Sequence, residues 1–346
     1  MKKTLIELSS LGGISGFETE ISDKIRELLD KYCDEVSSDK LGNYIGKISC
    51  GKENAEKIML VAHTDGIGFV VSEILDRGFL RISPVGGIDA KILFGCDVTI
   101  WGKRAINGVI GAKPPHLSSA DDSTKTAKIC DMVVDTGFSR DELLEIVSVG
   151  DMVTFKDSAQ ELLGDFISGK YLDDRAGIVS LLIAAEKIKE RNIKKDVYLL
   201  LSSQEEVGTR GALTGAFGIN PDVAIVVDVT HGKTPDSDAD RSFKCGSGAA
   251  VCTGPNICPY MYELATKCAK KNDIAFETEV EGGATGTDAE VVQIARGGIP
   301  CALLSIPLKF MHTTVEMLDF KDVEAVGNLI AEMACDFSLE ELLCSL

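Results

Sequence analysis

The run Lys57-Ile-Met-Leu-Val-Ala62, followed at once by His63-Thr64-Asp65-Gly66, sets a pattern that recurs along the chain. A short, continuous apolar run is typical of a strand that is buried on both faces. Similar runs occupy residues 196–201, 223–227 and 301–306. Stretches with helical character lie at residues 174–190, 259–271 and 288–296. Strands that alternate with helices predict an α/β fold with a mixed, largely parallel sheet flanked by helices.

Residues 68–164 differ from the rest of the chain. Helical periodicity is weak there, and glycine, proline and aspartate separate short β-rich segments. This pattern predicts a small all-β domain inserted into the α/β fold. A length of 346 residues suits about two domains. We therefore expect residues 1–67 and 165–346 to form one discontinuous α/β domain, which the β domain of residues 68–164 interrupts.

The composition argues against several kinds of partner. A net charge of −18 opposes binding to nucleic-acid backbones and to anionic membranes. No apolar run approaches the ~18 residues of a membrane span, and Glu7 interrupts the apolar core that a signal peptide needs. Eleven cysteines, an odd number at irregular spacings, fit reduced thiols better than a secreted disulfide framework. We expect a cytoplasmic protein that binds neither nucleic acid nor membranes.

Potential metal ligands follow every one of the four apolar runs. In chain order they are His63, the pair Glu205-Glu206, Asp228 and His312. Sites in open α/β sheets form at the carboxyl ends of strands, so we expect these groups to share one crevice. Asp173 is a further candidate, because it begins a helical stretch whose dipole favours a carboxylate.

Each of these residues alone has a simpler interpretation. A histidine after a strand is more often a surface residue, adjacent glutamates usually lie in a solvated loop, and Asp173-Asp174 suits a helix cap. Asp228 is more informative, because an unpaired carboxylate after four apolar residues is costly to bury. The coincidence at four strand ends favours a shared site.

The ligand types point to a particular kind of metal centre. Histidine and carboxylate without cysteine suit Zn²⁺, Co²⁺ or Mn²⁺ rather than a structural cysteine-rich zinc site. Five protein ligands are too many for one tetrahedral ion with an open position, and they suit two ions that share a bridging carboxylate. The charges agree, because three carboxylates and a bridging hydroxide would neutralise two divalent ions.

Several longer motifs lie along the chain, and most of them contain a candidate ligand. They are Gly13-Ile-Ser-Gly-Phe-Glu18, His63-Thr-Asp-Gly-Ile-Gly68, Gly169-Lys-Tyr-Leu-Asp-Asp-Arg-Ala-Gly177, Gln204-Glu-Glu-Val-Gly-Thr-Arg-Gly-Ala212, Asp228-Val-Thr230, Gly286-Thr-Asp-Ala289 and Met311-His-Thr313. These motifs resemble the glutamyl aminopeptidase or tetrahedral (TET) aminopeptidase family of dinuclear metallopeptidases, some of which are called cellulase M or deblocking aminopeptidases. They occur in the family's order and span nearly the whole chain.

The resemblance implies a role for each candidate ligand. One metal ion would be held by His63 and Asp228, the other by Glu206 and His312, and Asp173 would bridge them. The expected cofactor is therefore two divalent ions per subunit, with zinc first and cobalt or manganese as alternatives. The fold implied is a zinc-peptidase-like catalytic domain.

The resemblance also implies roles beside the metals. Glu205 would be the general base, Asp65 would orient His63, and the peptide bond between Asp173 and Asp174 would be cis. One departure is Lys309-Phe310, where relatives often carry Arg-Tyr, so a contact on the substrate side is expected to differ.

The family implies an assembly as well. The inserted β domain would mediate dimerisation, and dimers would assemble into a homo-oligomer, commonly a dodecamer. His116, in the insert, would either reach a neighbouring subunit or face solvent. His231 would either border the substrate pocket or be structural, and residues 232–250 are expected to form the pocket wall.

The function predicted is a metal-dependent aminopeptidase that removes N-terminal residues from short peptide substrates. A metal-bridging hydroxide, with Glu205 as base, would attack the scissile carbonyl. One alternative is a glycoside hydrolase of the endoglucanase type, although the chain has only one tryptophan. Another is an inactive metal-binding scaffold, although no expected ligand is missing. The sequence does not choose among acidic, apolar and basic N-terminal residues.

Overall fold

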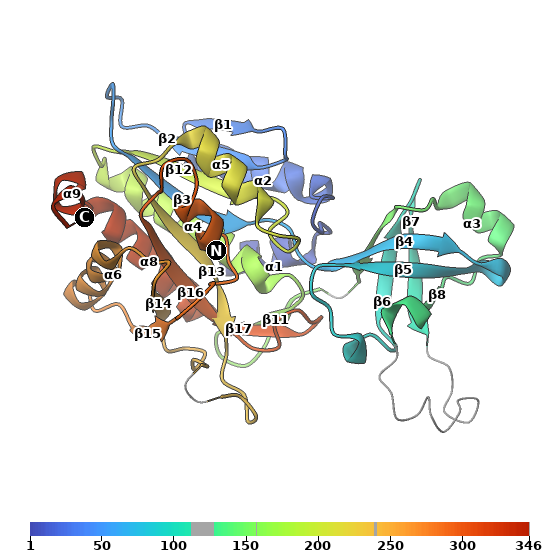
Figure 1. Cartoon of the computed structure of the whole chain (residues 1–346). Coiled ribbons are helices and arrows are strands. Elements are labelled where there is room, and N and C mark those ends of the chain that lie inside the picture. Colours follow the sequence, from blue (N-terminus) through green and yellow to red (C-terminus); the bar gives the residue numbers. More distant parts are fainter. Residues whose placement is uncertain (112–127, 157, 239–240, 346) are drawn as a thin grey trace.

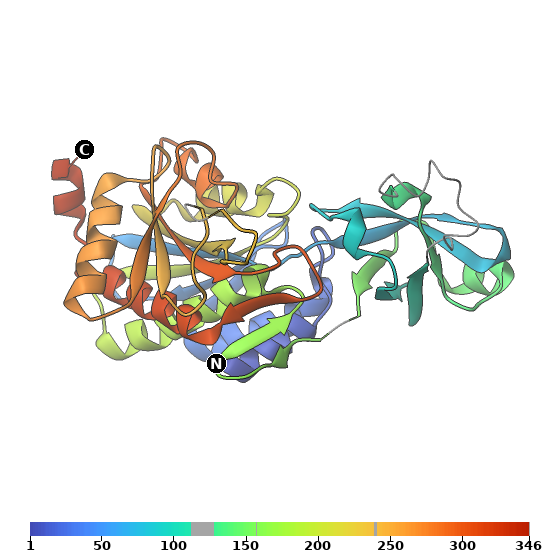
Figure 2. The same ribbon diagram turned by 90° about the horizontal axis from the view of Figure 1, so that it is seen from below.

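The computed structural model describes residues 1–111, 128–156, 158–238 and 241–345. The chain forms an α/β domain from which a smaller β-barrel projects to one side (Figures 1 and 2). His116 lies outside the described residues. Among the described residues, no helix is both long and apolar enough to cross a membrane.

The α/β domain is built on a mixed sheet of eight strands. Its centre consists of four mutually parallel strands, which are β12 (Asp196–Ser202), β3 (Lys57–His63), β13 (Val223–His231) and β16 (Cys301–Leu308). These are the four predicted strands. The outer strands are β1 (Glu35–Ser38) and β2 (Tyr44–Ile48) beyond β12, and β14 (Ala249–Thr253) and β15 (Phe276–Val280) beyond β16. The prediction of a mixed, largely parallel sheet is confirmed.

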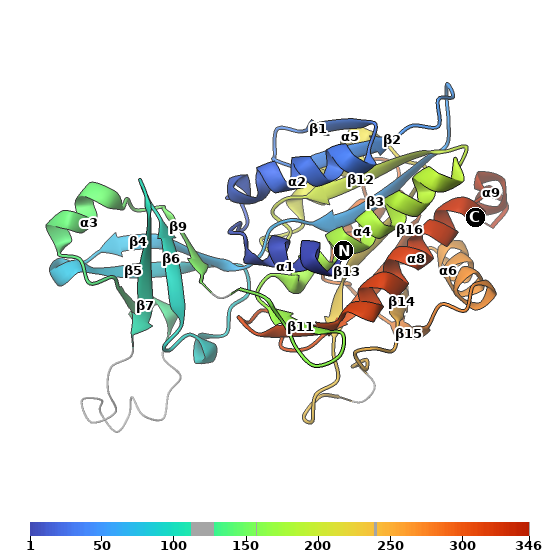
Figure 3. The ribbon, with the colours of Figure 1, turned by 180° about the vertical axis from the view of Figure 1, so that it is seen from behind.

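Helices cover both faces of the sheet, which explains why its central strands are apolar throughout. In β3, Ile58 and Leu60 face one core, whereas Met59 and Val61 face the other, because successive side chains point to opposite sides. Figure 3 shows the first face, covered by α1 (Lys2–Ser10), α2 (Thr19–Tyr32), α4 (Leu172–Arg191) and α8 (Phe320–Asp336). The same core includes α6 (Pro259–Lys271) and α9 (Leu339–Ser345), and the opposite core includes α5 (Arg210–Ile219) and α7 (Ala289–Gln293).

One predicted helix is shorter than expected. The interpretation of residues 288–296 as helix is wrong after Gln293, because Ile294 leaves helical geometry and Arg296 has a φ of 53°. Two glycines follow directly, Gly297 and Gly298, so the last turn has no helix-forming residues to extend it. The remaining predicted helices agree with α4 and α6.

The inserted domain is a closed six-stranded barrel with its own hydrophobic core. Its strands are β4 (Gly68–Ile74), β5 (Phe79–Val85), β6 (Asp97–Trp101), β7 (Ala105–Gly111), β8 (Val133–Asp135) and β9 (Met152–Phe155). Short 3₁₀ turns occur at Asp76–Gly78, Ala90–Ile92 and Ile129–Asp131. The next strand, β10 (Gln160–Glu161), pairs instead with β11 (Phe166–Gly169), which pairs with β17 (Glu316–Asp319).

The barrel domain is not purely β, because it also contains the helix α3 (Arg140–Ile146). Ser139 and Glu142 form a capping box at its N-terminus, in which each side chain accepts a hydrogen bond from the other residue's backbone N–H. This Ser-x-x-Glu spacing is a helix-start signal that the all-β interpretation overlooked.

We predict that the α/β domain folds without the barrel. Phe69 in β4 is the register partner of Val153 in β9, so the two ends of the insert lie about 5 Å apart and a short linker can join them. Replacing residues 70–152 with a glycine-serine linker removes α3 with the barrel and should leave a cooperatively melting protein that keeps the helices of the α/β domain, measured by circular dichroism. A chain that aggregates or melts without a transition would contradict separate cores.

Candidate metal centre and active-site cavity

The parallel strands bring the predicted ligands to one edge of the sheet. His63 is the last residue of β3, and Asp228 lies near the end of its neighbour β13. Glu206 lies in the loop after β12, and His312 lies four residues after the end of β16. Asp173 does not follow a strand of this sheet but lies in the first turn of the helix α4. The crevice expected at the carboxyl ends of the strands therefore contains all five residues.

These five residues form two clusters that share Asp173. In the first, ligand atoms of His63, Asp173 and Asp228 lie within 4.8 Å of one another, and His63 Nε2 is 3.0 Å from Asp173 Oδ1. The second cluster consists of Asp173, Glu206 and His312, whose ligand atoms also lie within 4.8 Å of one another. Here His312 Nε2 lies 3.3 Å from Asp173 Oδ2 and 3.2 Å from Glu206 Oε2. The two oxygens of Asp173 thus face different clusters.

The backbone around Asp173 is held by a residue that the sequence interpretation missed. The peptide bond between Asp173 and Asp174 is cis, as the resemblance implied. Oε2 of the buried Glu316 accepts hydrogen bonds from the N–H groups of Leu172 and Asp173, at 2.8 and 3.2 Å. Its Oε1 accepts from the N–H of His312, at 2.9 Å. Glu316 therefore fixes members of the second cluster, although no motif singled it out.

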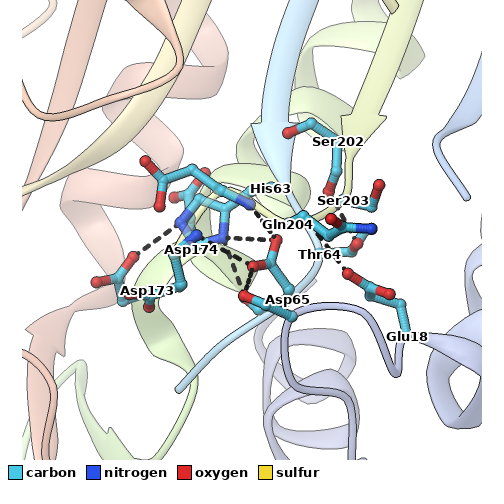
Figure 4. A network of polar contacts seen from close by, with 12 residues as sticks. Glu18, His63, Thr64, Asp65, Asp173, Asp174, Ser202, Ser203 and Gln204 are labelled. Carbon is cyan, nitrogen blue, oxygen red and sulfur yellow. Dashed lines mark hydrogen bonds and ion pairs between the residues drawn. The ribbon is translucent and has the colours of Figure 1, made fainter. Parts of the chain in front are cut away.

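Asp65 lies beside His63 and organises the loop that carries the two glutamates. Figure 4 shows His63 between Asp173 on one side and Asp65 on the other. His63 Nδ1 is 3.0 Å from the backbone oxygen of Asp65 and 3.7 Å from its Oδ1. The carboxylate of Asp65 accepts hydrogen bonds from the N–H groups of Glu205 and Glu206, at 3.0 and 3.2 Å. Asp65 thus links the histidine to both glutamates.

Glu205 and Glu206 differ in their surroundings, although they lie in a turn, where the backbone oxygen of Glu205 accepts hydrogen bonds from the N–H groups of Gly208 and Thr209, and not on an extended segment. The carboxylate of Glu206 belongs to the second cluster, whereas Glu205 belongs to neither. Both line the same cavity. Burial, helped by Asp228, Asp288 and Glu206, raises the pKa of Glu205 to about 10 against the opposing effect of His63.

The site holds more buried negative charge than its histidines can balance. Burial raises the pKa of Asp174, Asp228 and Glu316 well above the usual range. Burial also lowers the pKa of His312, but hydrogen bonds to Asp173 and Glu206 outweigh it and raise the pKa to about 11. Such a group of carboxylates calls for additional cations.

Unpaired atoms behind the clusters support the same conclusion. Asp174 Oδ2 and Asp288 Oδ1 are buried and have no hydrogen-bond partner among the described residues. The other oxygen of Asp288 accepts a hydrogen bond from Ser202 at 2.5 Å, and burial raises the Asp288 pKa to about 6. The donor set of imidazole nitrogens and carboxylate oxygens fits Zn²⁺, Co²⁺ or Mn²⁺. The residues present therefore fit divalent metal ions.

A cavity of about 620 Å³ opens over the two clusters. His231 lines it, as expected if this residue borders a substrate pocket. The expectation that residues 232–250 form its wall is wrong for the described part of that segment. Gly232 instead forms a β-bridge to Phe243, so the chain turns back on itself after β13, and the wall comes from residues 279–291. Met311 lines the cavity as well, next to the unusual Lys309-Phe310 pair.

An α/β sheet with linked histidine–carboxylate clusters beneath a cavity is an arrangement typical of hydrolases that use metal ions. The chain belongs to the M42 glutamyl aminopeptidase family, whose model matches residues 42–329. This match confirms the resemblance seen in the motifs, and it supports an aminopeptidase activity.

Characterised relatives extend over nearly the whole chain. The chain is 36% identical to the lysyl aminopeptidase of Pyrococcus furiosus, with 90% of each chain covered. It is 27% identical to the glutamyl aminopeptidase of Lactococcus lactis, with 91% of this chain and 90% of the relative covered. The two names describe substrates of opposite charge.

Solved structures agree with the fold. A TET aminopeptidase from a marine sediment archaeon of the Thaumarchaeota has a TM-score of 0.93 at 31% identity, covering 99% of this chain and 98% of that chain. The Pyrococcus horikoshii TET1 peptidase, described as assembling into a tetrahedron or a large octahedral shell, has a TM-score of 0.85 at 31% identity, covering 97% and 99%. A Thermotoga maritima structure described as an endoglucanase has a TM-score of 0.77 at 29% identity, covering 98% and 99%.

We predict that Glu316→Ala destabilises the metal-free protein by about 3 kcal/mol or more, because it leaves three N–H donors without their acceptor. The measurement is the free energy of unfolding in urea. Glu324→Ala, on the exposed side of α8, is the matched control and should change it by less than about 0.5 kcal/mol. Equal stabilities of the two variants would contradict the positioning role of Glu316.

Proposed function

We propose that this chain is a metal-dependent aminopeptidase that hydrolyses N-terminal residues from short peptides. The observation that carries the proposal is the pair of clusters sharing Asp173, with Glu205 beside them in the cavity. Membership of the M42 family supports the peptidase class. The specific mechanism below is derived from the residues of the site.

Two divalent ions would occupy the clusters, with zinc the expected metal and cobalt or manganese as alternatives. His63 and Asp228 would hold one ion, Glu206 and His312 the other, and Asp173 would contact both. When bound, such ions polarise a scissile carbonyl and lower the pKa of an attacking water. Asp65 would keep His63 oriented through the contacts to Nδ1.

Glu205 would act as the general base and then as the acid. Its carboxylate would take a proton from the attacking water and hand it to the amine that leaves. The metal-free pKa of about 10 is too high for a base at neutral pH. Positive charge in the adjacent clusters would lower that pKa toward the working range, so ion binding and base function are coupled.

The protein is also proposed to be a cytoplasmic homo-oligomer. The assembly described for the TET1 relative supports the homo-oligomer. The barrel would supply the dimer contact, because its described surface exposes four large apolar side chains, which are Phe94, Val109, Leu144 and Val149. Assembly of dimers into a dodecamer follows the family pattern.

Peptide hydrolysis is favoured over the two alternatives. The Thermotoga neighbour is described as an endoglucanase, but no aromatic side chain lines the cavity among the described residues. A polysaccharide site would be expected to offer such a platform. An inactive scaffold would be expected to lack a ligand or Glu205, and all are in place.

We predict that chelation abolishes aminopeptidase activity and that Zn²⁺, Co²⁺ or Mn²⁺ restores it, because the carboxylates alone cannot polarise a carbonyl. The measurement is hydrolysis of aminoacyl chromogenic substrates by chelated protein, with the metal content checked by elemental analysis. A glycoside hydrolase acting through two carboxyls would tolerate the same treatment. Full activity in metal-stripped protein would contradict the mechanism.

We predict different effects for two adjacent substitutions. Glu205→Gln keeps the shape but removes the basic oxygen, so the rate should fall by about 10²–10⁴ while the metal content stays near two ions per chain. Glu206→Gln should weaken the binding of one metal ion, so part of the activity should return at high metal concentration. Calorimetric metal titration of both variants separates the roles. Loss of an ion in Glu205→Gln, with both retained in Glu206→Gln, would reverse the assignment.

A further inference from the structure

Beyond the two clusters and Glu205, the described cavity wall carries three more carboxylates. Glu279 and Glu281 lie at the end of β15, and Glu290 lies in the first turn of α7. None of the three forms an ion pair within the part of the chain that the structure describes. The described lining includes neither lysine nor arginine. Among the described residues the wall is therefore negative and lacks a permanently charged cation, and His231 is a nearby imidazole that acts on Glu279 electrostatically.

Glu279 is the most constrained of the three. Its side chain is 8% exposed, so the carboxylate is largely buried at the cavity surface. Thr230 donates its hydroxyl to Oε1, and Ser305 donates to Oε2 at 2.8 Å. Burial raises the pKa of Glu279, and these two hydroxyl groups oppose that rise. Each oxygen keeps an acceptor position free, because a carboxylate oxygen accepts more than one hydrogen bond.

The strand register places Glu279 at a defined distance from the first cluster. Ser305 is the register partner of Asp228, and Thr230 follows Asp228 by two residues on the same face of β13. Two residues of a strand span about 6.6 Å. The carboxylate of Glu279 is thus separated from the candidate metal ligand Asp228 by about the length of a long side chain. A cation that binds Glu279 could therefore be the end of a substrate side chain.

The intervening wall suits an aliphatic stem. Val291, Leu303 and Met311 line the cavity together with the carboxylates. Lysine and arginine pack their methylene groups on apolar surface while their charged ends reach polar partners. An acidic side chain entering the same space would meet like charge, and a short apolar one would leave Glu279 without a cation.

We propose that the cavity selects peptides whose N-terminal side chain is basic, lysine or arginine, and that Glu279 binds the cationic end of that side chain. This inference rests on the proposed aminopeptidase function and names its substrate class. Glu281 and Glu290, which are partly exposed, add a weaker attraction from the rim. The charge of the N-terminal side chain, rather than its size, then decides the preference.

The first test is a substrate panel with the metal-loaded enzyme. We expect kcat/KM for lysyl and arginyl p-nitroanilides to exceed that for the norleucyl compound, which matches the lysine stem without its charge, by about tenfold or more. The glutamyl compound should be the poorest. Faster hydrolysis of the norleucyl or glutamyl compound would overturn the inference and leave the aminopeptidase function intact. Hydrolysis of none of them would overturn both.

The second test asks whether Glu279 is the residue that binds the cationic end of the substrate side chain. Glu279→Gln should lower kcat/KM for the lysyl compound by about 30-fold or more, the cost of removing one member of a buried charge pair. The norleucyl value should change less than threefold, because one hydroxyl can keep donating to the amide oxygen while the other turns to accept from the amide nitrogen. Glu263→Gln, on the exposed side of α6, removes the same charge elsewhere and should change neither value.

An equal loss on both substrates would overturn the assignment, because Glu279 would then bind the α-ammonium common to all substrates or support the fold. Glu281→Gln and Glu290→Gln serve if Glu279→Gln fails to fold. Each should lower the lysyl value by about two- to fivefold and the norleucyl value by a smaller factor. Unchanged lysyl values in both rim variants would contradict an electrostatic wall.

Discussion

The structure depends on the concentration of buried carboxylates around Asp173. Each of its oxygens contacts a different histidine, and four further carboxylates share the same edge of the sheet: Glu205, Glu206, Asp228 and Asp174. Such a group is costly to bury unless cations compensate it. These buried carboxylates lie where a parallel sheet, the start of a helix and two loops meet. The proposed metal ions are the physical solution to that electrostatic problem.

Backbone hydrogen bonds keep these like charges close. Glu316 accepts hydrogen bonds from three N–H groups, those of Leu172, Asp173 and His312. Asp65 accepts hydrogen bonds from the N–H groups of Glu205 and Glu206. The barrel contributes as well, because a Cβ on Gly87 would lie 3.3 Å from the ring of His312. The β5–β6 loop thus lies close to the second cluster, and a larger residue in place of Gly87 would crowd the His312 ring. The site is assembled by both domains.

Sequence patterns predicted the central strands and the five clustered residues, because buried parallel strands are apolar throughout and the polar residues after them stand out. The assignment of each ligand to an ion stays a prediction. The sequence pattern does not reveal the roles of Glu316 and Glu279. Glu316 opens a short strand, and Glu279 alternates with exposed residues on β15, so neither position shows its burial. Their roles depend on contacts with residues distant in the chain, such as Leu172 and Ser305. The wall was assigned to the wrong segment for the same reason.

The central claim is that Asp173 is shared by two metal ions. Anomalous X-ray scattering from crystals of the zinc- or cobalt-loaded protein tests it most directly, because it locates each ion without assuming its ligands. The account predicts two peaks flanking Asp173, one beside His63 and Asp228 and the other beside Glu206 and His312. A single peak at saturating metal, or two peaks that do not share Asp173, would contradict it.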